Sequence, residues 1–418
     1  MRTSIVLIAL LGAQALAGCS SGGTGDPSPD SDLLEPPPPG AGVQYRMVST
    51  VAPGQEIERC KLFVAPPEGL YVQRDEVRFS SGSHHVILYK TAYREIPAET
   101  REGIAVDATE VHDCNRGATA AWEITGVIAG SQSYEGESFL GELPDGVALR
   151  VEPGTVLVMN THYLNATPEP LEADARVNLH TILPEQVEQE AGMLFHYNPF
   201  IRVPAQGEAS SRMRCPIAED ISLVRVQSHM HRRGVGFAAH HVRAGGGMDE
   251  IYTNEAWEQV PVKVFDTPLE VKAGEALDFR CDYVNTEPRD VAQGLTTRDE
   301  MCMLIGPYFP RRPGVDTCSY ERGVPAETWF GSGAATCAEA LACTAAAASN
   351  ADVYGCVVDS CPGAAEQLTG VLRCQITAGY GACEDACTEG AGPLDACDVC
   401  MADACAAESA ACAAAACD

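Results

Sequence analysis

The stretch "LVRVQSHMHRRG", residues 223–234, joins a β-type run to two histidines one residue apart. In a strand, side chains at positions i and i+2 project from the same face, so His229 and His231 can reach one point in space. Short runs of this kind recur from about residue 44 to 325, with Gly, Pro, Asp and Asn between them and no convincing helical periodicity. The pattern predicts an all-β fold of two antiparallel, jelly-roll-like β-sandwich domains.

The domain boundaries follow from changes in composition. We place the first sandwich at 44–186 and the second at 187–325, with the seam in "LPEQVEQEAG", residues 183–192. Residues 19–43 are rich in Gly, Ser, Pro and Asp, which cannot bury a core, so they are expected to form a flexible linker.

The N-terminus carries an export pattern. "MRTSIVLIALLGAQALAGCSS" has one Arg, an apolar run too short to span a bilayer, and small residues before Cys19. We interpret 1–18 as a lipoprotein signal peptide and Cys19 as a lipid-modified anchor; a buried hydrophobic helix is the alternative. The mature protein is then expected to be exported and membrane-anchored, facing the periplasm or the cell surface. The net charge of -30 argues against binding to nucleic acid.

The 19 cysteines fall into three groups. Apart from Cys19, six are spread through the body and 12 crowd into the last 82 residues. Both numbers are even, and thiols persist poorly outside the cytosol, so we expect three disulfides in the body and up to six in the tail. The tail, 330–418, is rich in Ala, which favours short helices stapled by disulfides. A thiolate metal cluster that includes "CDVC", residues 397–400, is the alternative.

Two groups of histidines are candidate metal ligands. For His229 and His231, a thioether from Met301 or Met303 in "RDEMCMLIGPYFP" could be the third donor, and such a soft ligand favours Cu(I). The second group joins the consecutive pair His84 and His85 to an imidazole at residue 162. Neighbours on a regular strand face opposite ways, so this pair needs a strand start or a distortion, which the preceding Ser-Gly-Ser permits. Three imidazoles suit copper or zinc.

The order of these motifs resembles one family. "HHVILYK", "GVALRVEPGTVLVMNTHYLN", "AGM", "HMHRRG", "GEALDFRCDYV" and "DEMC" follow one another as in the copper type II, ascorbate-dependent monooxygenases. That family includes the peptidylglycine α-hydroxylating enzymes and dopamine β-monooxygenase. The resemblance implies two β-sandwich domains, each with one copper, that face each other across a solvent-filled cleft. It also implies the disulfides Cys60–Cys114, Cys215–Cys318 and Cys281–Cys302.

The resemblance also implies a site and a reaction. His84, His85 and His162 would hold an electron-donating copper, and His229, His231 and Met301 a catalytic one, while Met303 would line the core or the cleft. The implied reaction hydroxylates a C–H bond with O2 and a one-electron reductant such as ascorbate. Where the peptide-amidating relatives bind a substrate carboxylate with Arg, Asn and Tyr, this chain has Gln227, Met303 and Ile305. A small, non-carboxylate substrate is therefore expected.

The remaining histidines receive structural interpretations. His180 and His196 are expected to be packed and hydrogen-bonded, and His112 to serve local structure, while His240 and His241 lack a visible third partner for a metal. A rival hypothesis is a non-catalytic copper-binding surface lipoprotein. Two dissimilar ligand sets favour catalysis, because storage would not need them.

Overall fold

The computed structural model describes residues 34–115, 117–133, 137–312, 314–319, 324–388 and 394–417. The predicted signal peptide, the predicted lipidation site Cys19 and the predicted linker up to residue 33 lie outside these ranges. Within them, no helix combines the length and the apolar composition needed to cross a membrane. The end of the predicted linker is attached to the body, because Gln44 Nε2 donates to the carbonyl of Leu34 at 3.1 Å and Asn178 Nδ2 to that of Glu35 at 2.7 Å.

The first half of the body is a β-sandwich. Four strands in the order β1-β9-β3-β7 face a five-stranded sheet in the order β5-β2-β8-β4-β6, and their inner side chains form one apolar core. The elements are β1 (Gly42–Val51), β2 (Glu56–Val64), β3 (Leu70–Phe79), β4 (Ser83–Thr91), β5 (His112–Asp113), α1 (Ala118–Ala121), β6 (Ile124–Ser131), β7 (Val147–Val151), β8 (Val156–Leu164) and β9 (Leu171–Thr181).

The second half is a second sandwich. After a short 3-10 turn, η1 (Pro184–Gln186), strands in the order β10-β19-β13-β16 face a sheet in the order β15-β14-β17-β12-β20. The elements are β10 (Gln189–Tyr197), β11 (Arg202–Val203), β12 (Glu208–Pro216), β13 (Ile221–Met230), β14 (Gly234–Val242), β15 (Met248–Asn254), β16 (Lys263–Val271), β17 (Ala276–Val284), β18 (Val291–Ala292), β19 (Cys302–Phe309) and β20 (Thr328–Phe330).

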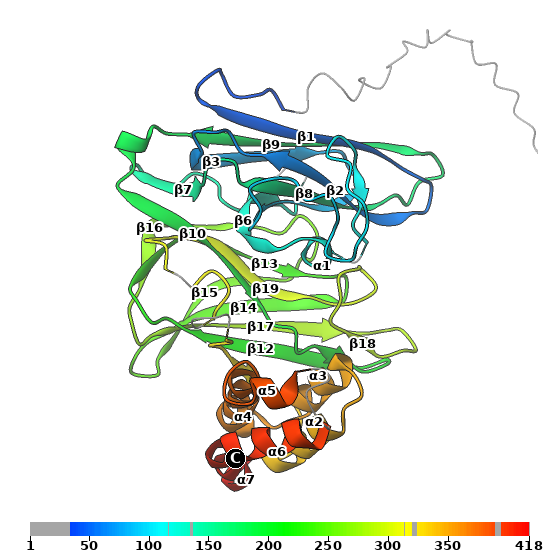
Figure 1. Ribbon diagram of the computed structural model, residues 1–418, viewed down its shortest axis with the longest axis vertical. Coiled ribbons are helices and arrows are strands. Elements are labelled where there is room, and N and C mark those ends of the chain that lie inside the picture. Colours follow the sequence, from blue (N-terminus) through cyan, green and yellow to red (C-terminus); the bar gives the residue numbers. More distant parts are fainter. Residues whose placement is uncertain are drawn as a thin grey trace, which may run out of the picture.

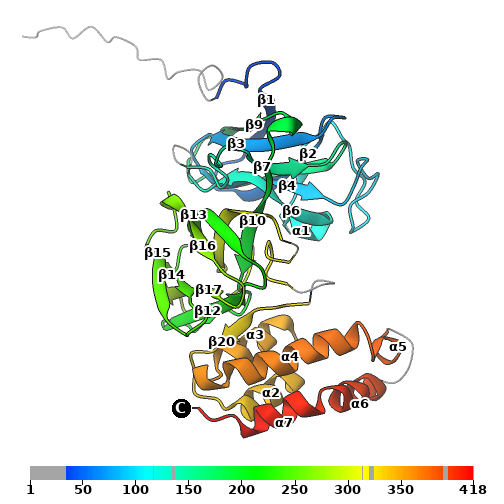
Figure 2. The same cartoon turned by 90° about the vertical axis from the view of Figure 1, so that its left-hand side faces the viewer.

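The two halves share one sheet. β7 pairs with β10 in parallel through Val147–Gln189, Ala148–Glu190 and Leu149–Ala191, which makes a continuous eight-stranded sheet, β1-β9-β3-β7-β10-β19-β13-β16. Figures 1 and 2 show β10 passing between the upper and the middle layer of the molecule. The antiparallel pattern expected from the sequence holds for the other pairs of named strands, and this parallel pair fixes how the sandwiches meet.

The tail is helical and disulfide-linked, as the sequence predicts. It contains α2 (Cys337–Ala346), α3 (Asn350–Val358), η3 (Pro362–Ala364), α4 (Ala365–Gly379), α5 (Glu384–Cys387), α6 (Leu394–Ala404) and α7 (Ala406–Ala414). Its twelve cysteines form six disulfides: Cys337–Cys412, Cys343–Cys356, Cys361–Cys417, Cys374–Cys405, Cys383–Cys400 and Cys387–Cys397. The alternative of a thiolate metal cluster at 397–400 is therefore wrong, because both of those sulfurs are bonded elsewhere.

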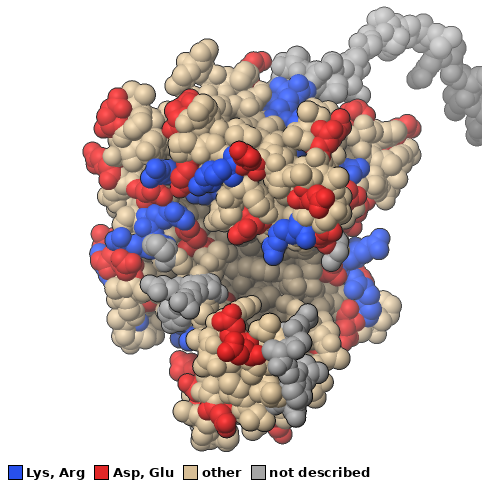
Figure 3. Space-filling view, viewed as in Figure 1, with Lys and Arg blue, Asp and Glu red and all other residues tan. Residues whose placement is uncertain are grey.

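The tail packs on the second sandwich as an extension of its core. Leu368 and Val371 of α4 join the same apolar cluster as Trp329 of β20, and the Thr369 hydroxyl accepts a hydrogen bond from the Trp329 backbone. Residues 330–418 carry twelve acidic side chains and one basic one. In Figure 3 the lower part of the molecule accordingly shows red patches, whereas both signs mix above it. The tail therefore adds to the negative charge that disfavours anionic partners.

The three body disulfides implied by the family resemblance are confirmed: Cys60–Cys114, Cys215–Cys318 and Cys281–Cys302. Cys281 lies on β17 and Cys302 begins β19, so this bond links the two sheets of the second sandwich beside Met301. The nine disulfides among the described residues suggest an exported protein.

The first prediction concerns Gly306, in the middle of β19. A Cβ added there would lie 2.2 Å from the backbone oxygen of Arg225 on β13, so the two strands would have to separate. We expect Gly306→Ala to lower the free energy of unfolding by about 1–3 kcal/mol. Thermal unfolding would measure it, with Gly245→Ala as the control because a Cβ there meets nothing within 4 Å. Equal midpoints for the two variants would contradict this account of the β13–β19 contact.

Candidate metal centre

Five histidines from both halves of the body meet in one buried cluster. The ring centroid of His84 lies 5.4 Å from that of His85, 5.5 Å from His162, 5.3 Å from His229 and 5.5 Å from His231. Every one of these side chains is at most 7% exposed. The structure therefore brings all five candidate imidazoles together, with His84 at the centre.

The consecutive pair on β4 is possible because the strand is irregular at its start. The register between β4 and β8 shifts between Ser83 and His85, so His84 falls at the distortion that the sequence requires. The preceding Gly82 has a φ of +90°, a conformation that favours glycine. Ser83 Oγ then donates to the carbonyls of His85 at 3.1 Å and His162 at 3.0 Å, which holds this turn against β8.

A bulge in β13 turns the His229 side chain toward the first half. Ile221 and Leu223 pack into the core of the second sandwich, and so do Val226 and Met230. In a regular strand, odd-numbered and even-numbered residues would face opposite sides. The ladders with β16 and β19 shift register between these pairs. A bulge turns the following side chains to the other face, so His229 projects toward the first half.

Met301 is placed by its backbone next to His231. The last pair of the β13–β19 ladder is Met230–Cys302, so one step further along the chains lie His231 and Met301. The Tyr283 hydroxyl donates to the Met301 carbonyl at 2.8 Å, and the Met301 side chain is half-buried against the apolar core shared by the halves.

Four of the imidazoles have one ring nitrogen held by a protein acceptor. His85 Nε2 donates to Asn160 Oδ1 at 3.3 Å, and His162 Nε2 donates to Glu56 Oε1 at 3.0 Å. In the second half, His231 Nδ1 donates to the carbonyl of Asp299 at 3.2 Å, and His229 Nδ1 donates to Oε1 of Gln132. These acceptors fix the orientation and the tautomer of each ring.

Four further ring nitrogens of the cluster lack partners. His84 Nε2, His85 Nδ1, His162 Nδ1 and His231 Nε2 are buried with no hydrogen bond to any described residue. One nitrogen anchored to the protein and one left free is the arrangement of metal-binding histidines. Ligand atoms of His84, His85 and His229 also lie within 4.8 Å of one another. The donor set therefore fits a metal that takes imidazole ligands, such as copper.

Burial keeps four of the imidazoles, those of His84, His85, His229 and His231, neutral. It holds the pKa of His84, His85 and His229 well below the usual 6.5, and the charges that neighbouring imidazoles would carry lower it further. Burial lowers the pKa of His231 to about 3, and electrostatic repulsion from His162 is the next largest cause. Each of these four rings therefore has a lone pair available at neutral pH.

One carboxylate from each half supports the cluster. The hydrogen bond from His162 lowers the pKa of Glu56 to about 2, so this group is charged. Glu300 is fully buried and accepts from the backbone N–H groups of His231 at 3.1 Å and Arg233 at 2.9 Å. Burial raises its pKa to about 7. Glu56 thus orients a ring directly, whereas Glu300 positions the backbone that carries His231.

The prediction of a solvent-filled cleft between the two ligand groups is wrong for this structure. Glu56 Oε1 accepts from the backbone N–H and the hydroxyl of Thr297 at 2.9 and 2.7 Å, and Gln132 Nε2 donates to the carbonyl of Ser228 at 2.8 Å. These contacts close the halves on each other. The centroid of the Trp257 ring lies 5.4 Å from that of the His84 ring. A recess of about 350 Å³, with Glu56, Glu58 and Arg298 in its wall, reaches His162 from the surface.

The other histidines behave as the sequence indicates. His196 Nε2 donates to the carbonyl of Val315 at 2.7 Å, His180 binds Glu76 at 2.6 Å, and His112 binds the carbonyl of Asp107 at 2.8 Å. His241 is paired with Glu275 at 2.6 Å. Among the described residues, the one grouping of three or more potential ligands is that of His84, His85 and His229, so residues 240 and 241 form no further site.

Sequence reasoning missed several residues that shape the cluster. Glu56, Gln132 and Thr297 are ordinary polar residues in sequence, and only the contact between the halves gives them a role. Trp257 had a weak signal, because it is one of three tryptophans and lies in the loop after β15.

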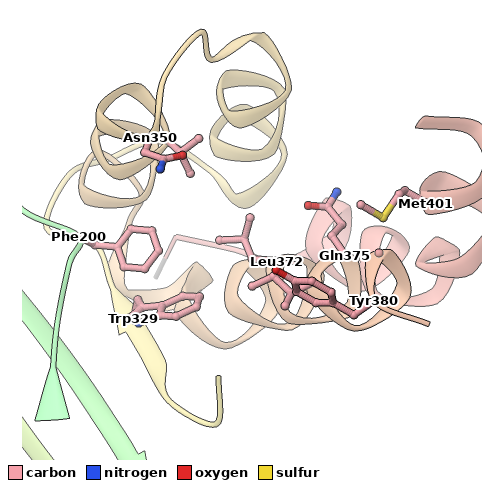
Figure 4. Close-up of a pocket in the computed structure, with 10 residues that line it drawn as sticks. Phe200, Trp329, Asn350, Leu372, Gln375, Tyr380 and Met401 are labelled. Carbon is pink, nitrogen blue, oxygen red and sulfur yellow. The ribbon is translucent and has the colours of Figure 1, made fainter. Parts of the chain in front are cut away.

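A second cavity lies away from the histidines. It measures about 470 Å³ and lies where the tail meets the second sandwich (Figure 4). Phe200 and Trp329 form one end of it, and Tyr380 and Met401 the other. It contains no candidate metal ligand of the cluster.

Comparisons with known proteins bear on the second half. Residues 191–327 match the family model described as "Copper type II ascorbate-dependent monooxygenase, C-terminal domain". This range contains His229, His231 and Met301, and the match supports a general copper-dependent monooxygenase role that uses copper and a reductant.

Solved structures offer only weak likenesses. The 7S globulin of Momordica charantia is 8% identical, with 64% of this chain and 74% of that one covered and a TM-score of 0.15. The structure of infectious bursal disease virus Gt strain is 9% identical, with 69% and 76% covered and a TM-score of 0.15. At such scores neither carries an argument about fold or function.

The second prediction follows from the low histidine pKa values. Because His84, His85, His229 and His231 hold protons weakly, protons compete little with a metal. We expect the affinity for Cu(I) to change by less than about 10-fold between pH 7 and pH 5. Three histidines with ordinary pKa values would lose about 10⁴-fold over the same range. Competition with a chelator of known pH dependence measures this, and a loss of the larger size would refute neutral, buried ligands.

Proposed function

We propose that this protein is a copper-dependent monooxygenase that hydroxylates a C–H bond of a small, non-carboxylate substrate, with O2 and a one-electron reductant such as ascorbate. The observation that carries the proposal is the buried cluster of five imidazoles, four of which are anchored through one nitrogen only. The family match over 191–327 supports the same chemistry.

In this proposal two copper ions bind per chain. His84, His85 and His162 hold the electron-donating ion, and His229, His231 and Met301 hold the catalytic ion. Copper bound there supplies one-electron redox chemistry and the activation of O2. The thioether of Met301 makes the second set softer than the first, which favours Cu(I) there. The Cys281–Cys302 disulfide restrains the chain beside this ligand.

The protein contributes orientation and a dry environment. Asn160 accepts from His85 and donates to Glu58 Oε2 at 3.0 Å, so a buried chain of hydrogen bonds holds that ring. Gln132 of the first half orients His229 of the second. Because the anchored nitrogens carry the protons, the remaining ring nitrogens would bind a metal through their lone pairs without losing a proton.

The substrate proposal rests on the strand pair that carries His229. Gln227 pairs with Ile305, and His229 with Met303, so the four side chains share one face of the β13–β19 pair. Met303 and Ile305 are 3% and 1% exposed and belong to the apolar core. The nearby Arg225 is already bound to Glu137 at 3.0 Å. Among the described residues of this face, a substrate carboxylate would therefore find no cation that lacks a carboxylate partner, which disfavours it.

One polar group on this face is available. Nε2 of Gln227 is buried and has no hydrogen-bond partner among the described residues. An amide N–H can donate to a neutral oxygen, such as a carbonyl or a hydroxyl group. A mostly apolar molecule with one such oxygen therefore fits the position better than a peptide carboxylate.

The cellular placement is part of the proposal. The nine disulfides fit an exported protein, and the leader pattern fits attachment through a lipid on Cys19 at the periplasmic or outer face of a membrane.

The third prediction tests turnover. The copper-loaded protein, given ascorbate and labelled O2, should place one labelled oxygen atom in a product found by untargeted profiling of small molecules. Met301→Ile should keep the histidine ligands but lower product formation by at least about 10-fold, because the thioether is lost. His240→Ala, on β14 and outside the cluster, is the matched control and should keep full activity.

The outcomes separate the two functional hypotheses. Labelled product that disappears in Met301→Ile supports the monooxygenase. Tight copper binding without any labelled product, across a broad range of neutral substrates, would instead favour the copper-binding surface protein. Oxygen uptake alone decides nothing, because copper and ascorbate consume O2 without a substrate.

A further inference from the structure

His84, His85 and His229 are grouped across the boundary between the halves. Their ligand atoms lie within 4.8 Å of one another, and no other group of three or more potential ligands in the described ranges meets that condition. Two of them come from β4 of the first sandwich and one from β13 of the second. This trio differs from both ligand sets of the proposed function, because it takes side chains from each.

The free nitrogens of the trio are suited to one ion. His84 Nε2 and His85 Nδ1 are buried and without partners, and His229 is anchored through Nδ1, which leaves its Nε2 for a ligand. The three side chains are only 7%, 7% and 5% exposed, and the partnerless nitrogens of His84 and His85 are themselves closed to water. Three imidazole nitrogens are a suitable set for Cu(I) or Zn(II).

The contact between the halves holds the trio in place. Gln132, from the first half, binds His229 through its oxygen and the Ser228 carbonyl through its nitrogen, so one side chain fixes the strand and the ring. On the other side of the cluster, Glu56 binds His162 and Thr297 together. These two contacts keep the His229 ring close to the His84 ring.

We propose that His84, His85 and His229 form a metal site of their own in this closed arrangement, in which one Cu(I) ion binds both halves at once. The choice of copper rests on the proposed function, but the site itself does not require turnover. Because the same side chains serve the two separate sets, the first equivalent of copper is shared between the halves. The second equivalent requires His229 to part from His84 and His85.

The test on the unaltered chain is X-ray absorption at two copper loadings. With half an equivalent of Cu(I), the nearest neighbours of the ion should be nitrogen alone, because the trio contains no thioether. With two equivalents, scattering from the sulfur of Met301 should appear. A sulfur neighbour of equal weight at both loadings would overturn the proposal.

Variants provide a second, independent measurement. His84→Ala and His229→Ala should each weaken binding of the first Cu(I) ion by at least about 10-fold, since each removes a ligand of one site. The double variant should bind the first Cu(I) ion only slightly more weakly than either single variant does. Two independent sites predict the reverse: each single variant keeps a first ion of nearly normal affinity, and only the double variant loses it. His240→Ala serves as the control and should bind as the unaltered chain does.

The result can be told apart from failure of the proposed function. If His84→Ala and His229→Ala each weaken binding of the first ion but the unaltered chain forms no hydroxylated product, the oxygenase proposal fails and the shared site stands. If product forms but each single variant keeps a first ion of nearly normal affinity, the oxygenase stands and the shared site fails. Nitrogen neighbours alone would also fit the set His84, His85 and His162, so loss of the first ion in His229→Ala is the result that assigns this ion to the shared site. A sulfur neighbour at half an equivalent overturns the shared site on the unaltered chain, even where a variant does not fold.

Discussion

Burial of five imidazoles between two sandwiches is the constraint on which the rest of this structure depends. A neutral imidazole has one proton to donate and one lone pair that needs a partner. The protein supplies acceptors for the N–H groups of His85, His162, His229 and His231 but leaves lone pairs without donors. Each unsatisfied buried group costs about 1–3 kcal/mol, a cost that a bound metal would remove. The cluster is thus built for a ligand at the expense of the stability of the empty form.

The fold supplies this arrangement through a few irregularities. The register shift at the start of β4 allows consecutive histidines to reach one cluster, and the bulge in β13 turns His229 to the first half. The parallel β7–β10 pair then brings β4 and β13 within reach by joining the sandwiches into one sheet. Below the cluster, Val224, Met303 and Ile305 enter the core of the first half, so apolar packing continues across the boundary.

The sequence allows prediction of what local pattern controls. The β-type runs predict the strands, the i and i+2 spacing predicts one face for His229 and His231, and the cysteine count predicts the disulfides of body and tail. The closeness of the two ligand groups could not be predicted in this way. It depends on the β7–β10 pair, which aligns residues 147–149 with 189–191 and has no local signature. For the same reason Gln132 and Glu56 could not be recognised, because their roles come from contacts with the other half.

The closed state has a consequence for access, since Gln227, Met303 and Ile305 are all buried at the contact between the halves. The polar bridges there, Glu56 to Thr297 and Gln132 to Ser228, can be exchanged for water at a net cost of only about 0.5–1.5 kcal/mol each. Separating the apolar side chains costs more, about 25 cal/mol for each Å² exposed. A mostly apolar substrate would cover that surface again on entering, whereas a charged one would not. The preference for a neutral substrate therefore follows from what opening exposes as well as from the side chains around His229.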